Sequence, residues 1–127
     1  MPKKVAVGGT SPKTLPFTPC IKYGNLLFVS GQGPIGRDGK VVAGDVKVQT
    51  RQTLDNFRRV LGEAGASMDD VLQTNVYLID LNDFQAMNEV YTTYFHDPKP
   101  ARTTVKAELV FGMKVEIQGI AAISTEE

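Results

Sequence analysis

The sequence predicts an α+β domain, in which one mixed β-sheet carries two helices on one of its faces. Two observations lead to this class. Short apolar or alternating runs, typical of strands, occur near both ends of the chain and once in its middle. Residues 45–64 and 82–95 instead repeat apolar side chains at the spacing of a helix. Because 127 residues is the length of one domain, we expect a single domain over residues 1–127.

The first third of the chain is expected to contain strands and turns. Lys4–Val7 is interpreted as a short strand, followed by a loop rich in proline and glycine. After a turn at Tyr23-Gly24-Asn25, the apolar run Leu26–Val29 predicts a buried strand. This strand is expected to stop at Ser30, where two nearby glycines would let the backbone approach a ligand or another chain.

The helix over residues 45–64 is predicted by apolar residues three or four positions apart, namely Leu54, Phe57, Leu61 and Ala64. Gly65 stands where a glycine commonly ends a helix. Residues 71–79 alternate and predict a strand, one side of which holds Leu72, Thr74, Val76 and Leu78. The second helix is expected to run from an N-cap at Asn82 to about Phe95 and to bury Phe84, Met87, Tyr91 and Tyr94.

The last two strand-like runs are expected to pair as a hairpin. One face of the first run holds Thr103, Val105, Ala107 and Leu109, and the other holds Arg102, Thr104, Lys106 and Glu108. After a turn at Phe111-Gly112, residues 115–123 alternate so that Glu116 lies opposite an apolar face. The hairpin is therefore expected to bury one face and to present Arg102 and Glu116 on the other.

The register of that hairpin places Arg102 about five residues from Glu116 along the strands. At ~3.4 Å per residue this is ~17 Å, which is too far for one small substrate. Either the register differs, or the two side chains meet across a boundary between subunits, and we favour the second. Self-association is also expected because too few elements remain to cover the second face of the sheet.

Arg102 and Glu116 are the pair most suited to chemistry. An arginine grips a carboxylate with two parallel hydrogen bonds, although a surface salt bridge is the alternative for Arg102. A carboxylate in the position of Glu116 could orient or activate a water, and its alternative role is an ion pair between strands or subunits.

Five other residues carry weaker signals. Ser30 and the backbone of Gly31 could donate hydrogen bonds to a ligand, or could simply end a strand. Asn88 lies at the margin of the second helix's apolar face. Cys20 and His96 occur once each, with no third residue to complete a zinc site or a catalytic dyad, so both are interpreted as structural. No metal and no cofactor is expected.

Composition excludes several functions. Lysine and arginine number 14 and so do aspartate and glutamate, so a neutral chain makes nucleic acid an unlikely partner. No apolar run is long enough to span a membrane. A single cysteine fits a reducing compartment, and we expect a cytoplasmic protein.

Motifs distributed over residues 17–122 resemble, in order, those of the RidA/YjgF/YER057c/UK114 family of enamine/imine deaminases. They are Leu27-Phe28-Val29-Ser30-Gly31-Gln32, Gln52-Thr53-Leu54-Asp55-Asn56, Leu81-Asn82-Asp83-Phe84 with Asn88 and Tyr91, Tyr94-Phe95, Pro100-Ala101-Arg102, and Val115-Glu116-Ile117. The resemblance implies a chorismate-mutase-like fold and a homotrimer with sites in the clefts between subunits. It also implies hydrolysis of 2-iminobutanoate, 2-iminopropanoate and related imines to 2-keto acids and ammonia.

The resemblance also implies roles for single residues. The arginine matching Arg102 grips the substrate carboxylate, and the glutamate matching Glu116 holds the attacking water. The backbone at Thr104 contacts the imine region, and Ser30-Gly31 lies in the same pocket. Phe17 stands where the family often has a tyrosine near the substrate, and Thr104 where it often has a cysteine.

The segment 109–114 is about a residue shorter than usual in the family and lacks its Leu-Pro, which bears on substrate size. Three alternatives therefore accompany the deaminase. They are a trimer that senses small carboxylates without catalysis, a deaminase for a larger substrate such as 2-aminomuconate, and a ribonuclease. Zero net charge and one histidine argue against the ribonuclease.

Overall fold

The computed structural model describes residues 2–8 and 13–124, so the expected loop around residues 9–12 lies outside the described part. The described residues form one six-stranded sheet in the order β1-β2-β3-β6-β4-β5. The strands are β1 (Val5–Ala6), β2 (Cys20–Tyr23), β3 (Leu26–Gln32), β4 (Val71–Leu78), β5 (Ala101–Lys106) and β6 (Val115–Ala122). The expected α+β class, one mixed sheet with two helices on one face, is confirmed.

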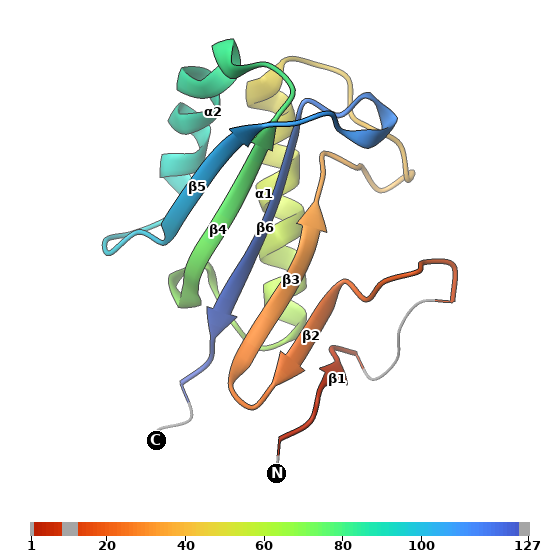
Figure 1. Ribbon diagram of the computed structural model, residues 1–127, viewed down its shortest axis with the longest axis vertical. Helices are drawn as coiled ribbons and strands as arrows, with labels where there is room; N and C mark the ends of the chain where they lie inside the picture. The colour runs from red at the N-terminus through yellow and green to blue at the C-terminus, as the bar shows by residue number, and fades with distance from the viewer. Residues whose placement is uncertain (1, 9–12, 125–127) are drawn as a thin grey trace.

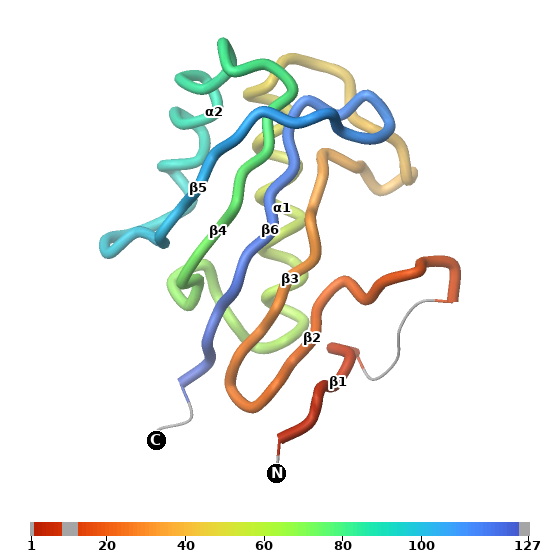
Figure 2. The backbone as a smooth tube through the Cα atoms, viewed as in Figure 1, coloured from red at the N-terminus to blue at the C-terminus, as the bar shows by residue number. Residues whose placement is uncertain are grey.

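Both long helices, α1 (Val46–Glu63) and α2 (Phe84–Tyr91), lie behind the sheet in Figure 1 and leave its other face open. We call these two sides the covered face and the open face. The tube in Figure 2 shows α1 crossing behind the middle of the sheet and α2 lying behind the end formed by β4 and β5. Among the described helices, none is long and apolar enough to cross a membrane.

The helix α1 forms where the periodicity predicted it. The Asp45 side chain accepts a hydrogen bond from the Val48 amide and caps the first turn. Its apolar side packs Leu54, Phe57 and Leu61 into the core with no exposed surface. Gly65 ends the helix with a φ of 80°, a left-handed conformation that favours glycine.

The second helical segment begins differently from the prediction. Asp80, rather than Asn82, provides the cap, because its carboxylate accepts from the Asn82 amide. Residues 81–83 and 92–94 form single 3₁₀ turns on either side of α2. Phe84, expected in the core, is 38% exposed, whereas Met87 and Tyr91 are buried as expected.

Three strand predictions need correction. The strand β2 was not expected, and β3 continues past Ser30 to Gln32, with a register shift between Val29 and Gln32 that gives it an extra bend. Leu72 was expected beside Thr74 on the apolar side of β4. It is 53% exposed, because the pairing of β4 with β6 shifts between Val71 and Gln73.

The prediction that the last two strands pair as a hairpin is wrong. β5 pairs parallel with β4 at the edge of the sheet, and β6 enters between β3 and β4, antiparallel to both. The physical reason is the helix α2, which carries the chain from the end of β4 back to the start of β5, as a parallel pair requires. The segment Val110–Gly112 after β5 is therefore a 3₁₀ turn between non-adjacent strands, with the Phe111 side chain 81% exposed.

Candidate active site

Arg102 is the second residue of β5 and points to the covered face. Its register partner is Thr74, which has no exposed surface and bonds to the Tyr91 hydroxyl of α2 at 2.7 Å. The Arg102 guanidinium carbon lies 4.7 Å from the centre of the Tyr91 ring and 5.6 Å from that of Phe84. Both are cation–π distances, so two rings of α2 hold the guanidinium beneath the helix.

The charge of Arg102 has no counter-ion inside the described chain. No hydrogen bond or ion pair joins its guanidinium to any residue among 2–8 and 13–124, so a salt bridge within the subunit does not explain it. Burial raises the pKa of the neighbouring Tyr91 hydroxyl, while the Thr74 hydrogen bond and the Arg102 charge lower it. Arg102 is therefore positioned by rings and left free to bind an anion.

A hollow of about 290 Å³ opens beside this guanidinium and is lined by Asn88, Tyr91, Thr92, Lys99, Pro100 and Arg102. The Asn88 Oδ1 and Thr104 Oγ1 atoms are buried and have no hydrogen-bond partner among the described residues. Thr104 pairs in register with Val76 of the covered face, two positions after Arg102. We call Arg102, Asn88 and Thr104 the arginine half-site.

Glu116 occupies the open face. It is the second residue of β6 and pairs with Tyr77, while the alternating Val115 and Ile117 are fully buried on the covered face. Its carboxylate occupies the space above Gly31 of the neighbouring strand β3, where any Cβ would overlap it. A residue larger than glycine at position 31 would therefore displace the Glu116 carboxylate from the place it occupies.

Partial burial raises the pKa of the Glu116 carboxyl above its ordinary value. Within the part of the chain that the structure describes, its carboxylate has no hydrogen bond or ion pair. A carboxylate that is poorly solvated and has no ion-pair partner is a good proton acceptor, which is the property a general base needs.

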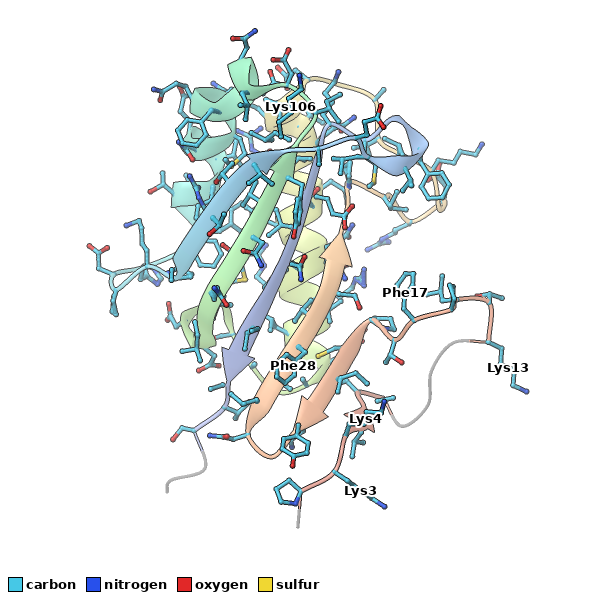
Figure 3. All side chains as sticks on the ribbon, in the orientation of Figure 1. Lys3, Lys4, Lys13, Phe17, Phe28 and Lys106 are labelled. Carbon is cyan, nitrogen blue, oxygen red and sulfur yellow. The ribbon has the colours of Figure 1, made fainter. Side chains whose placement is uncertain are left out.

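Ser30 directly precedes Gly31 in β3, and its hydrogen bond connects it to the segment of Phe17. The Ser30 hydroxyl donates to the Thr18 carbonyl at 2.6 Å and so ties β3 to the segment that carries Phe17. Phe17 is 51% exposed and lies in Figure 3 before β2, at the opposite side of the molecule from β5. We call Glu116, Gly31, Ser30 and Phe17 the glutamate half-site.

The two half-sites do not meet within one chain. In register, Arg102 stands beside Thr74 and Thr74 beside Gly119, so Arg102 and Glu116 are two strands and three residues apart. Strand spacings make this ~14 Å between Cα atoms, and the side chains leave opposite faces of the sheet. The expectation that both would share one outward face is thus wrong, because the hairpin that implied it does not form.

The aromatic residues beneath Arg102 were not identified as part of a site from the sequence, where Phe84 and Tyr91 were assigned only to the helix core. Their seven-residue spacing on one helical face, next to a strand carrying arginine, was the available signal. Lys99, which lines the hollow, was also missed, and its position within a proline-rich turn gave no signal.

Cys20 and His96 are placed as structural residues. Cys20 is 1% exposed, and burial, followed by the charge of Glu63, raises the pKa of its thiol. His96 pairs at 2.9 Å with Asp69 on the surface. No group of three or more histidine, cysteine, aspartate or glutamate side chains among the described residues could hold a metal ion.

Fold and site together define a class: a small α+β protein with an arginine held by aromatic rings at a sheet edge and a partly buried glutamate on the open face. The sequence also matches the family described as Endoribonuclease L-PSP over residues 9–123. The chain belongs to this RidA/YjgF family.

Individual relatives agree with that assignment. A RutC family protein of Pyrococcus abyssi is 45% identical over 124 residues, covering 95% of this chain and 98% of its own. The 3-aminoacrylate deaminase RutC of Acinetobacter baylyi is 38% identical, covering 87% of this chain and 89% of its own. The crystal structure of E. coli TdcF with bound serine superposes with a TM-score of 0.81 at 33% identity, covering 91% of this chain and 94% of that one.

Proposed function

We propose that the protein is an enamine/imine deaminase that hydrolyses small 2-imino acids, such as 2-iminopropanoate and 2-iminobutanoate, to 2-keto acids and ammonia. The observation that carries this proposal is Arg102, a positioned guanidinium without a counter-ion beside a hollow of metabolite size. One relative is named as a deaminase of 3-aminoacrylate, itself a small carboxylic acid with an amino group on a double bond, which supports this substrate class.

The chemistry needs few groups because an imine carbon is already electrophilic. Arg102 binds the substrate carboxylate and fixes the imine carbon in place. Glu116 accepts a proton from a water whose oxygen adds to that carbon, and the imine nitrogen gains a proton. When the resulting carbinolamine collapses, the carbon–nitrogen bond breaks, the carbonyl forms and ammonia leaves. Water is the sole co-reactant, so the proposal requires no cofactor and no metal.

This mechanism requires two copies of the chain, because Arg102 and Glu116 leave opposite faces of one sheet. The open face has the features of an interface, since Phe28 is 41% and Val105 42% exposed there and neither α1 nor α2 covers them (Figure 1). The arginine half-site lies at an edge strand, which a second molecule can approach. We therefore infer an oligomer that buries the open faces and joins the arginine half-site of one subunit to the glutamate half-site of the next. We propose that it is a homotrimer, the number of subunits that the resemblance to the family implies.

Two other parts of the proposal rest on the sequence. A cytoplasmic location stays a prediction from the single cysteine. The ribonuclease activity suggested by the family's description has little support here, because the only histidine in the sequence, His96, lies in an exposed pair with Asp69 and outside both half-sites.

The proposal is tested by coupling a serine or threonine dehydratase to the protein and following disappearance of the imine. Wild type should accelerate the decay, and Arg102→Ala should lower kcat/KM by about 10- to 100-fold, as expected for a lost charge-assisted hydrogen-bonded pair. Arg59→Ala, which removes an exposed arginine of α1, is the matched control and should leave the rate unchanged.

Glu116→Gln separates catalysis from sensing. The deaminase proposal expects slow hydrolysis with carboxylate binding largely kept. If wild type does not accelerate imine decay but is thermally stabilised by 2-keto acids, and Arg102→Ala loses that stabilisation, the protein senses carboxylates without turning them over. Acceleration of a larger imine alone would point instead to the substrate class of 2-aminomuconate.

A further inference from the structure

The hollow beside Arg102 contains a second cation that the proposed reaction does not use. Lys99 lines it together with Arg102, and Asn88, Tyr91, Thr92 and Pro100 complete the lining. Among the described residues that line the hollow, none is acidic. A monocarboxylate needs only one of these two cations, so binding a small imino acid through Arg102 alone would leave Lys99 without a role in the reaction.

The present partner of Lys99 holds it weakly. Its ammonium lies 3.0 Å from the Asp97 carboxylate, only two residues away in the same turn. The two side chains are 43% and 89% exposed, and ion pairs at such exposure contribute little. The ammonium is therefore free to exchange Asp97 for a ligand carboxylate that Arg102 brings into the hollow.

The acidic residue next to Asn88 in the sequence already has a partner. Glu89, adjacent to Asn88 on α2, pairs with Lys47 of α1 at 2.7 Å, with side chains 65% and 40% exposed. The Arg102 guanidinium is held by the rings of Tyr91 and Phe84. The lining of the hollow thus combines a planar arginine fixed by rings with a flexible, half-exposed lysine, whose long side chain can follow a second anionic group.

We propose that Lys99 binds a second carboxylate and that the preferred substrates are small 2-imino dicarboxylates, such as the imine of aspartate. This inference rests on the proposed function and narrows its substrate class. Arg102 takes the carboxylate next to the imine carbon, because its fork fixes the geometry of the reacting end. Lys99 takes the distal carboxylate, where a point charge on a long stem tolerates some variation in chain length. The volume of about 290 Å³ lies at the small end of ligand pockets and suits such a molecule.

The test compares two imines, each generated in situ by an amino-acid oxidase: 2-iminosuccinate from aspartate and 2-iminopropanoate from alanine. Wild type should show the higher kcat/KM with 2-iminosuccinate. Lys99→Gln should lower kcat/KM for 2-iminosuccinate about tenfold, the loss of one charge-assisted contact, and change the value for 2-iminopropanoate by less than about twofold. Lys3→Gln, at the opposite edge of the sheet in Figure 3, is the charge-matched control and should change neither. Equal effects of Lys99→Gln on both imines, or none on either, would overturn the inference.

Binding of unreactive analogues keeps this inference separate from the deaminase proposal. Calorimetry should find succinate bound about tenfold more tightly than propionate by wild type, and the difference should vanish in Lys99→Gln. Should neither imine be hydrolysed while this Lys99-dependent preference is present, the deaminase proposal fails and dicarboxylate recognition stands. If both imines are hydrolysed but succinate and propionate bind alike, the dicarboxylate inference fails and the deaminase stands.

Discussion

The covered and open faces of the sheet differ in how deeply they bury side chains and in the partners they offer to charged groups. On the covered face, Leu27, Val76 and Ile117 have no exposed surface, and Arg102 is held by two aromatic rings. On the open face, Phe28 is 41% exposed, and the Glu116 carboxylate has no hydrogen bond from the described residues. One chain therefore completes its core and positions the Arg102 guanidinium, but it leaves the Glu116 carboxylate without a partner among the described residues. Under the proposed mechanism, a second chain would complete the site after each chain has folded.

Mixing two inactive variants gives the largest expected effect, because a site shared between faces of different subunits can be repaired by complementation. Arg102→Ala and Glu116→Gln should each be nearly inactive alone. After subunit exchange, about a quarter of the sites in random mixtures combine an intact arginine with an intact glutamate, so about a quarter of wild-type activity should return. The imine-decay assay measures this recovery. Mass spectrometry should verify that subunits have exchanged. If activity does not recover after verified exchange, Arg102 and Glu116 do not act together across a subunit boundary, and the contrast between the two faces does not explain the site.

Truncating one phenylalanine on each face should separate stability from association. Phe57 is fully buried on the covered side, so Phe57→Ala should lower the free energy of unfolding by about 3–5 kcal/mol. Phe28→Ala should leave secondary structure intact and shift the mass measured by ultracentrifugation toward single chains. A Phe28 variant with unchanged mass across a dilution series would show that the open face is not the interface.

A single methyl group at Gly31 should disturb catalysis without disturbing the fold. Gly31→Ala pushes its Cβ into the Glu116 carboxylate, so kcat should fall by about tenfold or more as the base moves. Gly62→Ala is the matched control, because its Cβ meets nothing within 4 Å in α1, and it should raise stability by about 0.5–1 kcal/mol. If Gly31→Ala keeps full turnover, Glu116 is not the base.

The smallest expected effects are changes of kcat/KM and of stability with pH. Glu116 accepts a proton only when ionised, and burial raises its pKa, so kcat/KM should rise with pH through an inflection above the ordinary glutamate value of about 4.3. The folded state also binds this proton more tightly than the unfolded state, so Glu116 should make stability fall as pH rises through the same interval. Glu116→Gln should lose both dependences, which rate–pH and unfolding–pH profiles can check.

Local periodicity predicted the elements well, and strand pairing poorly. Leu54, Phe57 and Leu61 predicted α1, because a helix forms from contacts within a few residues and ends at a glycine such as Gly65. β5 and β6 follow one another in sequence, and consecutive strands commonly form hairpins, so the sequence predicted that they pair directly. The strand β4 was predicted, but its position between β5 and β6 was not. The helix between β4 and β5 was the signal that could have indicated a parallel pair.

The wrong strand pairing also limited what the sequence could predict about the site. Residue chemistry selected Arg102 and Glu116, and the structure finds both without an ion pair among the described residues. Their faces could not be derived, because the side of a strand is set by its partners. In the edge strand β5, Arg102 and Thr104 form the more polar side by pattern, yet they share the covered face with Thr74 and Val76, while Val105 is 42% exposed. Alternation therefore indicated the wrong side of this strand.

The position of β6 has a consequence for the order in which the protein can form during synthesis. β1, β2 and β3 lie on one side of it, and β4, α2 and β5 on the other, and each group is assembled from consecutive segments. The strand that joins them, β6, is synthesised after every other described strand. Between the synthesis of β5 and that of residues 115–122, the growing chain carries the strands of two partial sheets, each with an unpaired edge where β6 will insert. A chain that ends between β5 and β6 would therefore expose two unpaired strand edges, which favour aggregation, rather than form a smaller version of the fold.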